Sequence, residues 1–238
     1  MERTRIKICG ITRPQDAAAA AEMGADAIGL NFFAGPRRIN LRQGYEILLA
    51  LPSMVTPVGL TSGPTPEFPE APTVDEIIAG YVIAEKPRRL RIRTFQIYGD
   101  GYTAISSQRS DDSMELWGVY HFVDYAGLFQ CPWLKCFFPK LIVVDAPARS
   151  ALGGTGTTLD WNAVAEACLN WGSKDMPPII LAGGLTPENV GEAIRIARPH
   201  AVDVSSGVEV PGRPGIKDQA KMRDFVQAVR AADEGLRS

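Results

Sequence analysis

The amino-acid sequence predicts an α/β protein, a single (β/α)8 TIM barrel that spans residues 1–238 as one domain. Short runs of apolar and β-branched residues alternate with stretches of helical periodicity, and this alternation is typical of a parallel sheet built from βαβ units. Eight such runs fall within 238 residues, close to the roughly 250 residues that eight βα units usually occupy. Strand signals continue on both sides of the proline-rich segment 63–72, so we expect no domain linker there.

The expected strands are short apolar runs, and they follow the chain in order. They cover residues 6–9, 27–32, 56–60, 92–98, 116–122, 141–145, 179–182 and 201–205. Helical periodicity predicts helices over residues 14–23, 42–51, 73–84, 159–171, 187–198 and 216–232. Thr12 and Thr186 are expected to place a hydroxyl at the caps of two of these helices, with Pro14 and Pro187 at the first helical positions.

Composition and charge exclude several classes of protein. The formal net charge is −2 and no cluster of basic residues occurs, so the sequence carries no electrostatic signal for nucleic acid or for a membrane surface. The mixed-charge N-terminal segment leads directly into a strand, so we expect neither a signal peptide nor a transmembrane helix. The four cysteines form no CxxC pair and the two histidines stand apart from them. We therefore expect a reducing cytoplasm and no metal site.

Two glycine-containing segments near the C-terminal end of the chain predict a phosphate site. Gly183 and Gly184 follow one expected strand, and Ser205, Ser206 and Gly207 follow the next. Glycines let backbone N–H groups approach an anion, hydroxyls add donors, and a helix N-terminus adds partial positive charge. In barrels of this type, phosphate commonly lies at the loops after the seventh and eighth strands. The alternative is that the paired glycines only make a tight turn.

Cys9 and Asp145 form a candidate base and acid. Each closes a strand-like run, and barrel chemistry concentrates at the carboxyl ends of the strands. Helix N-termini near Cys9 are expected to favour its thiolate, and a carboxylate that ends an apolar strand is costly unless it is paired or functional. The alternatives are that Cys9 only packs in the core and that Asp145 anchors a loop. Residues 153–156, a glycine-rich segment, are expected to form a mobile loop that closes over the ligand.

Strand periodicity predicts a second feature of this site. Side chains two residues apart point to the same face of a strand, so Lys7 lies one layer below Cys9 if Cys9 faces the barrel mouth. Asp203 and Ser205 share a face on the last strand, which neighbours the first strand in a closed barrel. We therefore expect Lys7 and Asp203 to form a buried ion pair that supports the site.

Several motifs, found in this order, resemble the phosphoribosylanthranilate isomerase family. The matching segments are residues 7–12, 24–32, 35–39, 144–145, 153–161, 182–190 and 201–209. The resemblance implies a TIM barrel that catalyses an Amadori rearrangement in tryptophan biosynthesis. In this reaction N-(5′-phosphoribosyl)anthranilate becomes 1-(2-carboxyphenylamino)-1-deoxyribulose 5-phosphate.

The resemblance also implies a role for each matching residue. Asp145 would be the general acid that opens the ribose ring, which requires a raised pKa, and Cys9 would be the general base at C2′, which requires only a modestly lowered one. Arg37 would lie near the anthranilate carboxylate, and Asp203 is placed among the residues that bind substrate. The phosphate would lie against Gly183, Gly184, Ser205, Ser206 and Gly207. The open-chain imine is itself an electron sink, so no cofactor is expected.

The centre of the chain departs from the family pattern. Tyr98 stands where the family has a histidine, residues 58–63 replace its usual third strand, and residues 101–138 show no family pattern. Two alternatives to the main interpretation are a related barrel isomerase that acts on another phosphoribosyl-amine and a non-catalytic protein that binds a phosphoribosyl ligand. The expected partner is a small phosphorylated molecule, bound by a monomer or a homodimer.

Overall fold

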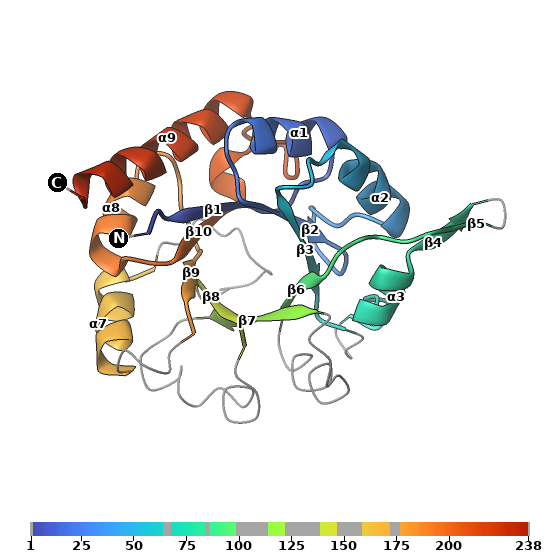
Figure 1. Cartoon of the computed structure of the whole chain (residues 1–238), viewed down its shortest axis with the longest axis horizontal. Helices are drawn as coiled ribbons and strands as arrows, with labels where there is room; N and C mark the ends of the chain where they lie inside the picture. The colour runs from blue at the N-terminus through green and yellow to red at the C-terminus, as the bar shows by residue number, and fades with distance from the viewer. Residues whose placement is uncertain are drawn as a thin grey trace.

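The protein is a closed barrel of parallel strands with helices outside it (Figure 1). The structure, a computed structural model, describes residues 2–63, 68–83, 86–98, 114–121, 139–146, 159–171 and 177–237. The barrel strands are hydrogen-bonded in the order β1-β10-β9-β8-β7-β6-β3-β2. Their bounds are β1 Arg5–Ile8, β2 Ala27–Asn31, β3 Thr56–Thr61, β6 Thr94–Ile97, β7 Glu115–His121, β8 Leu141–Asp145, β9 Ile179–Leu181 and β10 Ala201–Val204. The predicted barrel is confirmed.

The helices of the described residues lie outside this ring of strands (Figure 1). They are α1 Pro14–Glu22, α2 Leu41–Ala50, α3 Val74–Ala79, α7 Trp161–Trp171, α8 Val190–Ala197 and α9 Gln219–Gly235, with a short 3₁₀ helix, η1, at Ser206–Val208. In sequence order α1 packs against α2, α7 against α8 and α8 against α9, and α9 also contacts α1. The last helix therefore returns to the first, and both chain ends lie on the same side of the barrel (Figure 1).

Two apolar clusters cover the two faces of the barrel wall. Successive residues of a strand point to opposite faces, so a strand buried on both faces supplies both clusters. One cluster lies between strands and helices and includes Ile6, Ile8 and Phe225. The other lies within the barrel and includes Cys9 and Trp117. Trp117 is thus a core residue, and its indole Nε1 donates to Glu115 Oε1 at 2.8 Å.

The third predicted helix is shorter than expected. Thr73 and Glu76 form a capping box that begins α3, but the helix ends at Ala79 instead of residue 84. Gly80 follows with φ 75°, a conformation that favours glycine and terminates the helix. The next residues form β4 (Tyr81–Ile83), which pairs antiparallel with β5 (Lys86–Arg88). This hairpin, which the sequence did not predict, projects away from the barrel (Figure 1).

The predicted threonine caps are wrong. Arg13 precedes α1 without a side-chain cap, and the Thr12 hydroxyl instead donates to the Gly215 carbonyl oxygen at 2.6 Å. The first helical position is Pro14, as predicted. At the other expected cap, residues 187–189 form a turn and α8 begins only at Val190. Tertiary hydrogen bonding, here to the loop before α9, overrides the local capping preference.

Candidate active site

The predicted site residues come together at the carboxyl ends of the strands. A pocket of about 70 Å³ opens there, and residues from β8, β9, β10 and β1, which are adjacent in the barrel, form much of its wall. All of the predicted site residues except Gly207 line it: Cys9, Arg37, Asp145, Gly183, Gly184, Asp203, Ser205 and Ser206. A larger cavity of about 590 Å³, lined by residues such as Cys168, Pro178 and His200, contains none of them.

Cys9 lies directly after β1 and faces the pocket. Its N–H donates to the Val204 carbonyl oxygen at 2.8 Å, which ties it to β10. Gly29 provides room for the sulfur, because a Cβ at this position would lie 2.5 Å from Cys9 Sγ. Burial raises the pKa of the Cys9 thiol, the Asp203 carboxylate raises it further, and Lys7 and Lys217 only partly offset this. The expected fall in the Cys9 pKa is therefore wrong, because the thiol is more deeply buried than its place beside a helix start suggested.

The predicted ion pair between Lys7 and Asp203 is present below Cys9. Lys7 Nζ lies 2.6 Å from Asp203 Oδ2, and the two side chains are only 2% and 7% exposed. Burial alone would lower the pKa of Lys7, but Asp203 and Cys9 raise it above its ordinary value. The other carboxylate oxygen, Asp203 Oδ1, is buried without a hydrogen-bond partner among the described residues. Asp203 lines the pocket, and one of its oxygens has acceptor capacity that no described residue uses.

Arg37 also reaches the pocket, but it is held by a carboxylate that the sequence interpretation missed. Glu209 accepts from Arg37 Nε and Nη2, both at 2.8 Å, and from Lys217 Nζ at 3.0 Å. Burial raises the pKa of Glu209, but the hydrogen bonds from Arg37 and the charge of Lys217 outweigh it and leave this pKa below its ordinary value. Burial lowers the pKa of Lys217. Its sequence position could have identified Glu209 as a site residue, because it follows β10 at the end of a motif already assigned to phosphate.

The glycines after β9 allow loops to approach one another closely. Gly183 and Gly184 have φ of 79° and 65°, and a Cβ on Gly183 would lie 2.6 Å from the Ala146 nitrogen and 3.0 Å from Asp145 Oδ1. Asp145 Oδ1 accepts a hydrogen bond from that same Ala146 nitrogen at 2.8 Å. Within the described part of the chain, the Gly184 N–H donates to no protein acceptor, so it is available to an anion.

Gly207 has a different position from the other predicted phosphate residues. A Cβ there would collide with the Leu185 carbonyl oxygen. Gly207 therefore lets the loop after β10 pack on the loop after β9, which holds Ser205 and Ser206 beside the two glycines. Asn189 supports the loop after β9, since its side chain accepts from Thr186 N–H at 2.8 Å and donates to the Gly184 carbonyl oxygen at 2.9 Å.

Tyr98, which follows β6, brings an aromatic ring to the pocket wall. Tyr98 lines the pocket, and its ring centroid lies 5.1 Å from that of Phe33, which in turn contacts Phe68 edge to face at 5.7 Å. Gln96 Nε2 donates to the Tyr98 hydroxyl oxygen at 2.9 Å. Burial raises the pKa of Tyr98 well above its ordinary value, and Cys9 and Asp145 raise it further, so the phenol is neutral.

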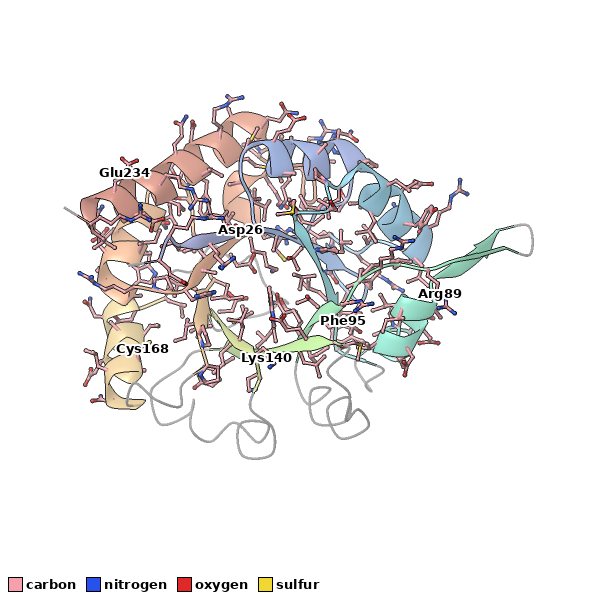
Figure 2. All side chains as sticks on the ribbon, viewed as in Figure 1. Asp26, Arg89, Phe95, Lys140, Cys168 and Glu234 are labelled. Carbon is pink, nitrogen blue, oxygen red and sulfur yellow. The ribbon has the colours of Figure 1, made fainter. Side chains whose placement is uncertain are left out.

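Several expectations fall partly or wholly outside the described residues. The glycine-rich segment 153–156 is among them, as are Cys131 and Cys136. Cys168 is described, and it lies on α7, outside the ring of strands (Figure 2). In the part of the chain that the structure describes, no three metal-ligating side chains gather. No helix among these residues has the length and apolar character needed to cross a membrane.

Fold and site together define a (β/α)8-barrel protein with a thiol, two carboxylates and an arginine gathered in one pocket. A family model described as N-(5′-phosphoribosyl)anthranilate (PRA) isomerase matches residues 81–228. Two curated relatives named N-(5′-phosphoribosyl)anthranilate isomerase cover nearly the whole chain. That from Chlorobaculum tepidum is 37% identical over 98% of both chains, and that from Pseudomonas fluorescens is 40% identical over 99% of this chain and 100% of its own.

Solved structures agree with the sequence relatives. Phosphoribosylanthranilate isomerase from Thermotoga maritima superposes with a TM-score of 0.75 at 28% identity, covering 96% of this chain and 99% of its own. An isomerase of this kind in complex with reduced 1-(o-carboxyphenylamino)-1-deoxyribulose 5-phosphate gives 0.69 at 27% identity, with the same coverage. The chain belongs to the N-(5′-phosphoribosyl)anthranilate isomerase family.

Proposed function

We propose that the protein catalyses the Amadori rearrangement of N-(5′-phosphoribosyl)anthranilate to 1-(2-carboxyphenylamino)-1-deoxyribulose 5-phosphate in tryptophan biosynthesis. One observation carries the proposal: Cys9, which follows β1, and Asp145, which ends β8, line the same pocket although 136 positions separate them in the chain (145 − 9). A ligand that binds there contacts a thiol and a carboxyl group at once, as a proton transfer between two atoms of one sugar requires.

Asp145 acts as the general acid in the first step. It donates a proton to the ribose ring oxygen, the C1′–O bond breaks, and the nitrogen lone pair forms a C1′=N bond. Its place at the end of β8, on the wall of the pocket that Cys9 also lines, supports this role.

Cys9 acts as the general base in the second step. Its thiolate removes the C2′ proton, the released electron pair forms a C1′=C2′ bond, and the nitrogen regains its lone pair. Protonation at C1′ and loss of the C2′ hydroxyl proton then give the ketone, so the atoms balance and no redox partner is needed. The positive charges of Lys7 and Lys217 support the thiolate, since both lower the pKa of Cys9.

The remaining pocket residues bind the two ends of the substrate. Gly183, Gly184, Ser205, Ser206 and Gly207 are assigned to the phosphate, which the available Gly184 N–H supports. Arg37 is assigned to the anthranilate carboxylate, since an arginine can bind a carboxylate through two hydrogen bonds. Asp203 is assigned to a ribose hydroxyl, because the residue lines the pocket and one of its carboxylate oxygens has no hydrogen-bond partner among the described residues.

The proposal also covers the location, the domain organisation and the partners of the protein. We place it in the cytoplasm as a single-domain enzyme, monomeric or homodimeric, whose partner is a small phosphorylated substrate. A formal net charge of −2 supports the absence of a nucleic-acid or membrane partner. The imine intermediate accepts the electron pair from C2′ itself, so the reaction as written requires no cofactor or metal ion.

Loss of turnover without loss of binding tests the catalytic pair. Freshly generated phosphoribosylanthranilate should lose its anthranilate-type fluorescence when wild-type protein is added without a cofactor. Cys9→Ser and Asp145→Asn should each lower kcat by about 100-fold or more, the size expected for a general acid or base. Both variants should still bind reduced carboxyphenylamino-deoxyribulose 5-phosphate by calorimetry.

Two matched variants control for the substitutions themselves. Cys168→Ser changes a thiol on α7, and Asp160→Asn changes a carboxylate that accepts from the N–H groups of Asn162 and Ala163, which an asparagine also accepts. Both should keep full activity. Full activity in Cys9→Ser or Asp145→Asn would refute the assigned roles, and binding without turnover in the wild type would indicate a non-catalytic ligand-binding protein.

A further inference from the structure

We propose that Glu209 and Lys217 are positioning residues that fix Arg37 in one orientation, and that this fixed guanidinium makes the protein prefer an amine moiety that carries a carboxylate. This inference rests on the proposed function and adds the residues that set its specificity. Neither residue is among the nine that the sequence predicts for the site.

The Arg37–Glu209 pair leaves part of the guanidinium free for a ligand. Arg37 Nε donates to Glu209 Oε1 and Arg37 Nη2 donates to Glu209 Oε2, both at 2.8 Å, so Glu209 occupies one edge of the planar group. Guanidinium has five N–H donors, and Nη1 lies outside this edge. The Arg37 side chain is 13% exposed and lines the pocket, and its Nη1 makes no hydrogen bond to any described residue.

Glu209 is itself held in place by two further donors. Its Oε1 accepts from the Gly215 N–H at 2.9 Å and from Lys217 Nζ at 3.0 Å. Lys217 Nζ also donates to the Ser205 carbonyl oxygen at 3.0 Å, which joins this network to the segment assigned to phosphate. Lys217 is fully buried and Glu209 nearly so. A carboxylate fixed by this many donors gives Arg37 a rigid support.

The backbone beneath Arg37 restricts its side chain in the same way. Gly10 has φ 71°, and a Cβ at this position would lie 2.5 Å from Arg37 Cδ. The arginine stem therefore crosses the chain directly above a glycine. An arginine held from both sides has lost its rotamer freedom before the ligand arrives, and this lowers the entropic cost of binding.

The charge of the cluster favours an anionic ligand. Arg37 and Lys217 carry two positive charges and Glu209 carries one negative charge, so one positive charge remains uncompensated within the cluster. Glu209 orients this charge without neutralising it, because the buried Lys217 offsets the carboxylate. A carboxylate on the aromatic ring of the substrate would neutralise this remaining positive charge, whereas an uncharged ring would not.

The test compares two substrates on four proteins. The phosphoribosylamines made from anthranilate and from aniline differ only by the ring carboxylate, and their kcat/KM ratio measures the preference for it. The proteins are the wild type, Arg37→Met, Glu209→Gln and the double variant. We expect the wild type to prefer the anthranilate compound and Glu209→Gln to lose at least about tenfold of that preference, the size of one charge-assisted hydrogen bond. The double variant should show the same ratio as Arg37→Met alone, because Glu209 acts through Arg37.

A matched control separates positioning from stability. Asp233→Asn changes another buried carboxylate in a dense hydrogen-bond network, one that binds Thr4 instead of a pocket residue. It should lower the unfolding midpoint while keeping the wild-type substrate ratio.

Three outcomes would overturn the inference: a wild-type ratio in Glu209→Gln, a double variant with a lower ratio than Arg37→Met, or no carboxylate preference in the wild type. If the wild type converts neither compound, the proposed function fails. The dissociation constants of the two reduced, unreactive product analogues then provide the same ratio and decide the role of Glu209 separately.

Discussion

Cys9 experiences opposing electrostatic influences at the floor of the pocket. Burial and the Asp203 carboxylate disfavour its thiolate, whereas the charges of Lys7 and Lys217 favour it. The net result is a pKa above the ordinary value of a cysteine thiol, so most of the protein with an empty pocket carries the protonated thiol at neutral pH. If Cys9 is the general base, as we propose, only the molecules that carry the thiolate can turn over substrate.

The thiolate population of Cys9 should therefore grow with pH throughout the neutral and mildly alkaline range. A raised pKa means that this population increases about tenfold for each pH unit below that pKa. We expect the ultraviolet absorbance that is characteristic of a thiolate, taken as the difference between the wild type and Cys9→Ser, to be small at pH 7 and to increase up to pH 9. A difference that has already reached its maximum at pH 7 would contradict a raised Cys9 pKa.

At the scale of elements, the register between β1 and β10 builds the support of the site. These strands pair in parallel with Lys7 opposite Asp203, so two inward side chains of opposite charge meet inside an otherwise apolar barrel. Lys7 also lines a cavity of about 230 Å³ on the side of the pair away from the pocket, whereas Asp203 lines the pocket itself. The ion pair therefore separates the active-site pocket from the lower part of the barrel.

Removing one member of this pair should destabilise the barrel more than removing both. Lys7→Met leaves a buried, unpaired carboxylate, and we expect a loss of about 3–5 kcal/mol in the free energy of unfolding. The Lys7→Met, Asp203→Asn double variant should recover part of this loss, because no unpaired charge remains. Chemical denaturation followed by circular dichroism measures both values.

A surface pair provides the comparison for this experiment. Arg42 and Glu46 lie one helical turn apart on α2 with side chains 70% and 49% exposed, so Arg42→Met should change the free energy of unfolding by less than about 1 kcal/mol. Lys7→Met with a wild-type unfolding midpoint would contradict the structural importance of the buried pair.

At the scale of the whole molecule, the sequence predicts the barrel and the residues at the rim of its pocket. It does not predict the contacts that orient these residues or shift their pKa values. Buried parallel strands appear in the sequence as continuous apolar runs. A closed barrel makes the first and last strands neighbours, and the two-residue period of each strand then predicts that Lys7 lies beside Asp203. The Arg37–Glu209 contact joins residues 172 positions apart in two irregular loops, where no periodicity exists to predict it. The direction of the Cys9 pKa likewise depends on burial in three dimensions.

The closed barrel also joins the two ends of the chain. The Thr4 N–H and hydroxyl both donate to the Asp233 carboxylate, and Arg230 Nη1 donates to the Thr4 carbonyl oxygen at 2.8 Å. α9 is thereby fastened to the residue before β1. If residues 1–238 form one domain, as we propose, a change at this junction must also destabilise the far wall of the barrel.

Asp233→Asn tests this coupling, with Trp117 of β7 as the reporter. In a background where Trp133, Trp161 and Trp171 are phenylalanine, the fluorescence of Trp117 follows unfolding inside the barrel. Loss of hydrogen bonds to a buried carboxylate should cost about 1–3 kcal/mol, and the Trp117 transition should record that full loss. Asp224→Asn, an exposed change on the same helix, should leave the transition unaltered. A Trp117 transition that stays at its original denaturant concentration while circular dichroism shows an earlier loss of helix would mean that the chain unfolds as two separate units.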